Sequence, residues 1–198
     1  ITTSNFSRGS DGIDLSNADA SFGGFYIDLD GLDNVNLGGN ISIEMAVKNN
    51  NRTIKAIYFL SVGENASGDN QAFVNARYNV KQNKMFFGVR TDEKNNGVSY
   101  TERKISEENT TVIDDGDEHH YIFSINCNSS TPSSSTLDIY IDGESKVTNN
   151  TVDLEKALTT NARSTNFIGT RKNVDDGTGL TYLNGVVKYL KIYQNAMS

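Results

Sequence analysis

The stretch Gly39-Asn-Ile-Ser-Ile-Glu-Met-Ala-Val-Lys48 decides the fold class of this chain. Apolar side chains recur at every second position, at Ile41, Ile43, Met45 and Val47, with polar or small residues between them. Successive side chains of a strand point to opposite faces of a sheet, so this alternation predicts a strand that is buried on one face. Such a strand is typical of an antiparallel sheet with one face on a core and the other toward water.

Similar short runs lie on both sides of this strand along the chain. The further predicted strands cover residues 25–30, 56–62, 73–80, 84–91, 98–105, 120–127, 136–141, 166–169 and 186–193. Turn-forming sequences such as Asn96-Gly97, Asp142-Gly143 and Asp176-Gly177 separate several of them. Only residues 152–160 carry apolar side chains at helical spacing. We therefore predict an all-β protein: an antiparallel two-sheet β-sandwich of the jelly-roll kind, with at most one or two short helical turns.

Length and composition limit the organisation and the partners. The 198 residues suit one large all-β domain, so we expect residues 1–198 to form a single domain on which a leading segment, 1–21, also packs. A net charge of -7 disfavours nucleic acid as a partner. No apolar run is long enough to predict membrane insertion. Cys127 is the only cysteine, which excludes a disulfide within the chain.

Four segments, in order, resemble the laminin-G-like branch of the concanavalin A-like superfamily over residues 22–198. The first is the stretch quoted above, in which Ala46 stands where the family has Trp. Asp117-Glu-His-His-Tyr-Ile-Phe-Ser-Ile125 is similar to the family's Trp-His-His-Val-Ala-Phe segment. Leu137-Asp-Ile-Tyr-Ile-Asp-Gly143 is similar to its Leu-Tyr-Val-Asp-Gly strand. The fourth segment is the closing region, which resembles the closing elements of the family in two stretches: Phe167-Ile-Gly169 and Asn184-Gly-Val-Val-Lys-Tyr-Leu-Lys-Ile-Tyr-Gln-Asn-Ala-Met-Ser198.

The resemblance implies a concanavalin A-like fold and points to Ca²⁺ as the cofactor. In many relatives an acidic strand near the N-terminus and an Asp of the closing strand hold one ion, which maps here onto Asp28 or Asp30 and the position of Lys188. Lysine cannot ligate calcium, so this sequence departs from the pattern. A separate acidic loop, Asp175-Asp176, offers further oxygen ligands, although ordinary solvated turns also account for these residues.

No catalytic pattern emerges from the sequence, and we predict that the protein is not an enzyme. Glycosidases of this fold need paired carboxylates, for which Glu-x-Asp-x-Glu on one strand face is the expected pattern, and this triplet is absent. Asp138 and Asp142 are interpreted as a solvated strand face and its turn. His119 and His120 should point to opposite faces of their strand, so they cannot share a metal ion, and a structural role is expected for both.

A polar strand face in the middle of the chain is the candidate ligand site. Planar amide and guanidinium groups around an aromatic platform are common in sugar recognition. An ordinary wet sheet face is the alternative explanation. The predicted ligand-binding residues are Asn75, Arg77, Asn79, Phe86, Arg90 and Tyr100.

The leading functional hypothesis is a noncatalytic recognition module for a glycan or another cell-surface molecule. It would belong to a larger secreted, adhesin-like or virion-surface protein, at an extracellular, cell-surface or virion-surface location. Two alternatives stay open: a structural or protein-interaction sandwich without a small ligand, and a glycan-cleaving enzyme with an unrecognised site.

Overall fold

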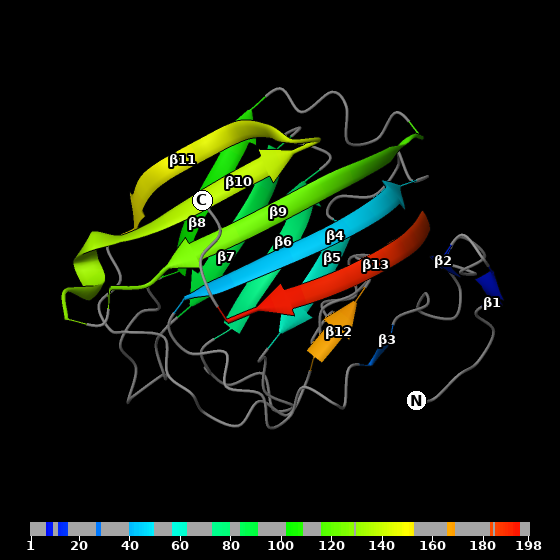
Figure 1. Ribbon diagram of the computed structural model, residues 1–198, viewed down its shortest axis with the longest axis horizontal. Helices are drawn as coiled ribbons and strands as arrows, with labels where there is room; N and C mark the ends of the chain where they lie inside the picture. The colour runs from blue at the N-terminus through cyan, green and yellow to red at the C-terminus, as the bar shows by residue number, and fades with distance from the viewer. Residues whose placement is uncertain are drawn as a thin grey trace.

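The computed structural model is an antiparallel sandwich of two sheets (Figure 1). It describes residues 7–9, 12–15, 27–28, 40–49, 57–62, 73–79, 84–90, 102–108, 116–128, 130–152, 166–168, 183 and 185–194. Every strand pairing within these residues is antiparallel. The predicted all-β, two-sheet architecture is therefore confirmed.

The two sheets take their strands from all parts of the chain. The front sheet, nearer the viewer in Figure 1, has the order β1-β2-β13-β4-β9-β10-β11. Its strands are β1 (Ser7–Gly9), β2 (Gly12–Asp14), β13 (Gly185–Tyr193), β4 (Ile41–Asn49), β9 (Glu118–Asn126), β10 (Ser135–Ile141) and β11 (Glu144–Val152). The back sheet has the order β3-β12-β5-β6-β7-β8. Its strands are β3 (Ile27–Asp28), β12 (Asn166–Ile168), β5 (Ile57–Val62), β6 (Phe73–Asn79), β7 (Lys84–Arg90) and β8 (Glu102–Glu108).

The core lies between the sheets and is built from the alternate apolar residues of the central strands. Ile43 pairs with Phe123 and Met45 with Tyr121 across β4 and β9, and all four are at most 1% exposed. From the back sheet, Phe87 is fully buried, and its ring centroid lies 5.1 Å from that of Phe123. The two rings are tilted by 32° to each other, and their contact joins the two layers of the sandwich.

Backbone geometry fixes the ends of two strand pairs. Asp142 and Gly143 have φ of 55° and 78°, the left-handed conformation of a two-residue hairpin turn, and they connect β10 to β11. At the other side of the sheet, a Cβ on Gly185 would lie 1.8 Å from the carbonyl oxygen of Lys48. Only glycine allows β13 to approach β4 this closely.

The strands that the sequence did not predict lie at or near the edges of the front sheet. β11 was not predicted, and Val152, expected to begin a helix, is its last residue, while 153–160 lie outside the described residues. β1 and β2 fall in the leading segment, where β2 pairs with β13. Edge strands bury less of their surface, so their sequences lack the apolar alternation that marks central strands. Within the described residues, no helix has the length and apolar character needed to cross a membrane.

Candidate functional site

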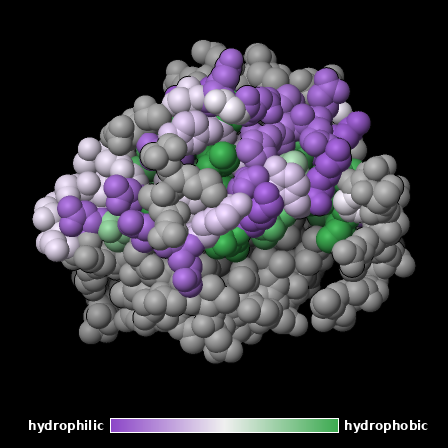
Figure 2. Space-filling view, in the orientation of Figure 1, coloured by the Kyte–Doolittle hydropathy of each residue, from purple (hydrophilic) through white to green (hydrophobic). Residues whose placement is uncertain are grey.

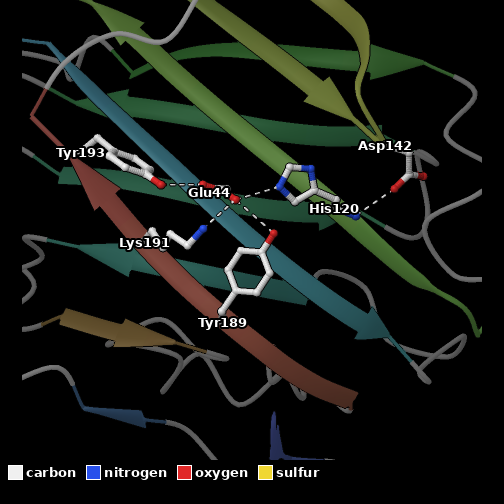
Figure 3. Close-up of polar contacts among 6 residues, drawn as sticks. All are labelled: Glu44, His120, Asp142, Tyr189, Lys191 and Tyr193. Carbon is white, nitrogen blue, oxygen red and sulfur yellow. Dashed lines mark hydrogen bonds and ion pairs between the residues drawn. The ribbon is translucent and has the colours of Figure 1, made fainter. Parts of the chain in front are cut away.

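The outer face of the front sheet carries a cluster of five polar side chains, which we call the Glu44 cluster: Glu44, His120, Tyr189, Lys191 and Tyr193 (Figure 3). Strand alternation turns Glu44 away from the core, because its neighbours on β4 are buried. A register shift between Val187 and Tyr189 lets β13 present three alternate residues on the same face. Hydrophilic residues dominate much of this face (Figure 2).

The Glu44 carboxylate is the centre of this cluster. Its Oε2 accepts a hydrogen bond from the Tyr193 hydroxyl at 2.7 Å. Its Oε1 accepts one from Tyr189 at 3.1 Å and one from the Lys191 ammonium at 3.2 Å, and the His120 Nε2 lies 3.2 Å away. The Glu44 side chain is 15% exposed, so these donors replace much of its water shell.

The hydrogen bonds fix the ionisation state of the cluster. The bond from Tyr193, together with those from Lys191, His120 and Tyr189, lowers the pKa of Glu44 to about 2, although burial opposes this shift. Conversely, the bond to Glu44 raises the pKa of Tyr193 and of Lys191. Burial and then the bond to Glu44 raise the pKa of Tyr189. At neutral pH the carboxylate is therefore ionised, and the two phenols and the ammonium are protonated.

This arrangement suits a structural anchor better than a catalytic group. A general acid for glycoside cleavage needs a raised pKa, whereas Glu44 has one of about 2. Both carboxylate oxygens of Glu44 already accept hydrogen bonds from the protein. The Lys191 ammonium also makes a cation–π contact, at 4.7 Å from the centre of the Tyr189 ring. Hydrogen bonds to Glu44 thus connect three residues of β13 to β4, and the contact of His120 connects β9 to β4 as well.

A second polar network joins β9 to the β10–β11 turn. The His119 Nδ1 lies 2.7 Å from the Asp142 Oδ2, and the amide of His120 donates to the Asp142 Oδ1 at 2.8 Å. The Asp142 amide donates in turn to the His120 carbonyl at 2.8 Å. Burial acts to raise the pKa of Asp142, but the bonds from His120 and His119 outweigh it and lower the pKa. His119 is buried and His120 reaches the outer face, so the prediction that they occupy opposite faces is confirmed.

The interpretation of Asp138 as part of a solvated face is wrong. Asp138 is 8% exposed, and its partner across β9, Ser124, is fully buried. Ser124 shares a hydrogen bond of 2.9 Å with the equally buried Ser42 of β4. Alternation alone assigns these residues to the outer face, but tertiary packing buries that end of the face.

Solved structures identify the fold, whereas no protein-family model and no curated protein matches this chain. The CBM40 module of the Ruminococcus gnavus IT-sialidase matches with a TM-score of 0.63 and 14% sequence identity, over 96% of this chain and 92% of that chain. The NanB sialidase of Streptococcus pneumoniae matches with a TM-score of 0.59 and 15% sequence identity, over 88% of this chain and 25% of that chain. Domains LG4-5 of mouse laminin alpha1 match with a TM-score of 0.51 and 10% sequence identity, over 81% of this chain and 37% of that chain. The fold is a concanavalin A-like jelly roll. The resemblance found in the sequence is thus confirmed at the level of the fold.

Five of the six predicted ligand-binding residues lie on the neighbouring strands β6 and β7 of the back sheet. In the β6–β7 register, Asn75 pairs with Gly88, Arg77 with Phe86 and Asn79 with Lys84. These positions alternate with the pair Ala76 and Phe87, which is fully buried in the core, so they belong to the outer face. Phe86 is half-buried, and Arg90 is four positions further along β7 on the same face. Tyr100 lies outside the described residues, and the role of all six in ligand binding stays a prediction.

The predicted calcium ligands fall mostly beyond the described part of the jelly roll. Asp28 ends β3 and pairs with Phe167 in the back sheet, while Asp30, Asp175 and Asp176 lie outside the described residues. The Lys188 ammonium lies 2.6 Å from the Glu118 carboxylate on the front sheet, so the position implied by the resemblance holds an ion pair. Among the residues that the structure describes, no group of three or more His, Cys, Asp or Glu side chains is arranged to hold a metal ion.

Sequence reasoning missed the Glu44 cluster, although the signal was present. Glu44, His120 and Tyr193 each belong to a segment that carries the laminin-G-like resemblance. Polar residues at fixed places in otherwise apolar segments need a partner when they are partly buried. In this jelly roll they partner one another.

Proposed function

We propose that this chain is a noncatalytic glycan-binding module of a larger extracellular protein. The match to the R. gnavus module carries the proposal, because it extends over nearly the whole of both chains. That module was solved in complexes with α2,3- and α2,6-sialyllactose. The match is to a complete module rather than to one part of a larger domain, which supports a binding role here.

The outer face of the back sheet is the proposed glycan site. On the front sheet, the Glu44 cluster and the Ser42–Ser124 pair use their polar atoms within the protein. On the back sheet, Asn75 and Arg77 occupy outer-face positions of β6, and Arg77 pairs in the register with the half-buried Phe86 of β7. Amide and guanidinium groups match the paired hydroxyls of a sugar, and an aromatic ring packs against its apolar face.

The state of Glu44 supports the noncatalytic part of the proposal, because it excludes this carboxylate as the general acid of a glycosidase. Its pKa of about 2 leaves it unable to donate a proton to a leaving group at neutral pH. The similarity to NanB covers 25% of that chain, so a sialidase activity of the whole enzyme does not transfer to this chain.

A glycan array tests the proposal directly. The purified chain is applied with calcium and then with a chelator, and the array includes both sialyllactoses. We expect retention of at least one glycan without release of reducing ends. Loss of retention in the chelator would support a calcium-ordered site, and unchanged retention would support the sheet face alone.

The other outcomes separate the alternatives. Release of reducing ends would favour a glycan-cleaving enzyme. Neither retention nor cleavage at high protein concentration would contradict glycan binding and favour a structural or protein-interaction domain. Immunolabelling of intact cells or particles with an antibody to the chain would test the proposed surface location.

A further inference from the structure

The loop between β9 and β10 contains an acceptor pattern for N-linked oligosaccharides. In the pattern Asn-x-Ser/Thr, the side-chain amide of the asparagine receives the sugar, and a hydroxyl group stands two residues later. Two such triplets, Asn40-Ile-Ser42 and Asn128-Ser-Ser130, have both the asparagine and the hydroxyl side chain within the described residues. The remaining triplets of the sequence begin at Asn5, Asn51, Asn65, Asn109 and Asn149.

These two triplets differ in the accessibility of their hydroxyl groups. Asn40 is exposed, but Ser42 is fully buried on β4, where its Oγ shares a hydrogen bond of 2.9 Å with that of Ser124. Asn128 and Ser130 are both exposed. A transferase must reach the amide and the hydroxyl of a triplet together. Of these two triplets, only the one at Asn128 therefore stays open to the enzyme after the chain has folded.

The contacts of the Asn128 side chain tolerate a substituted amide. Its nitrogen, Nδ2, donates a hydrogen bond to the Ser134 Oγ at 2.9 Å. A primary amide nitrogen carries two hydrogens, so one is left for this bond when a sugar replaces the other. Its oxygen, Oδ1, accepts from the amides of Ser130 at 3.1 Å and Thr131 at 2.9 Å, and attachment of a sugar to Nδ2 leaves that oxygen unchanged. The loop can thus keep its hydrogen bonds after modification.

The position of the loop separates this triplet from the proposed recognition face. Asn128 follows β9, and the chain enters β10 through the short 3-10 helix η3 (Pro132–Ser134) at one end of the front sheet (Figure 1). The proposed glycan site lies on β6 and β7 of the back sheet. We therefore expect a bulky, hydrated sugar on Asn128 to leave the recognition face open.

We propose that Asn128 is a modification site, which receives an N-linked oligosaccharide when the chain is exported. The proposal rests on the extracellular location that belongs to the proposed function. In the transfer, the Asn128 Nδ2 forms a bond to the anomeric carbon of an oligosaccharide carried by a lipid pyrophosphate. The bond between that carbon and the pyrophosphate breaks, the pyrophosphate leaves with the electron pair, and a base of the transferase takes one amide proton.

The experiment uses the full chain secreted from cultured animal cells, with glycopeptide mass spectrometry to measure the occupancy of each triplet. We expect Asn128 to carry an oligosaccharide. Ser130→Ala should abolish its occupancy, because this change removes the hydroxyl but keeps the Ser130 amide that donates to Asn128. Ser130→Thr restores the acceptor pattern and should keep the oligosaccharide. Ser133→Ala is the matched control, since Ser133 is an exposed serine of the same loop outside any triplet.

An unmodified Asn128 in the secreted chain would overturn this proposal, and so would equal occupancy in Ser130→Ala and Ser133→Ala. The same preparations are applied to the glycan array, where the wild type and Ser130→Ala should be retained equally. Retention by a chain with an unmodified Asn128 would overturn the modification site and leave the proposed function intact. A modified Asn128 in a chain that binds no glycan would contradict the proposed function alone.

Discussion

The two outer faces of the sandwich use polar residues in different ways. On the front sheet, Glu44 binds donors from β9 and β13, and its partner Tyr193 is 149 residues away in sequence. On the back sheet, Asn75, Arg77 and Phe86 occupy neighbouring positions supplied by two strands that follow each other in the chain. The first set links distant parts of the fold, and the second sits on a local hairpin. The hydrogen bonds of the first set support a stabilising role, and recognition is the role that we propose for the second set.

Removal of the central back-sheet positions should have the largest effect on binding. We expect Asn75→Ala combined with Arg77→Ala to abolish glycan retention, because both amide and guanidinium donors are lost. The free energy of unfolding should change by less than about 0.5 kcal/mol. Array binding and urea denaturation measure the two effects. Retained binding would move the site away from this face.

Removal of the Glu44 carboxylate should lower the stability of the fold and leave glycan binding unchanged. Glu44→Ala leaves three partly buried donors and the exposed Lys191 without their acceptor, so we expect a loss of about 3 kcal/mol of unfolding free energy with glycan retention intact. Urea denaturation measures the loss. Glu144→Ala is the control on the same sheet, because Glu144 is exposed and its pair with Lys146 should contribute little. Equal stability of both variants would refute the anchoring role.

The pH dependence of stability should separate the cluster from other carboxylates. The pKa of Glu44 is lowered from 4.5 to about 2 in the folded state, so its contribution is complete above pH 4.5 and is lost as the pH falls toward 2. This lowering of the Glu44 pKa corresponds to about 3 kcal/mol of unfolding free energy at neutral pH. Measured from pH 6 to pH 2, the difference in unfolding free energy between the wild type and Glu44→Gln should therefore shrink. A constant difference would mean that the charge of Glu44 contributes nothing.

The smallest effect is expected at the β10–β11 turn. Asp142→Asn keeps a residue that tolerates positive φ but removes the negative charge opposite His119. We expect a loss of about 1 kcal/mol in unfolding free energy and unchanged glycan retention, since the turn belongs to the front sheet. Thermal denaturation and array binding provide the measurements. A loss of binding in this variant would show that the two faces are coupled.

Local alternation of apolar and polar residues was enough to predict most of the central strands. β4, β6, β7, β9, β10 and β13 were predicted nearly in full, and so was the shared face of Asn75, Arg77 and Phe86. The period-2 pattern is a property of the strand itself and survives in any packing. The edge strand β11 was not predicted, because an edge strand buries less apolar surface and its sequence then lacks a clear alternation of apolar residues.

The order of the strands in each sheet, and the register of their pairing, could not be predicted and follow from the folded structure. The sequence contains Glu44, His120 and Tyr193 within its recognisable segments, but their meeting requires β4 to lie between β9 and β13. The shift between Val187 and Tyr189 then sets which residues of β13 reach Glu44. A shift by one residue would turn these side chains to the opposite face, and only the packing of the whole core fixes the register.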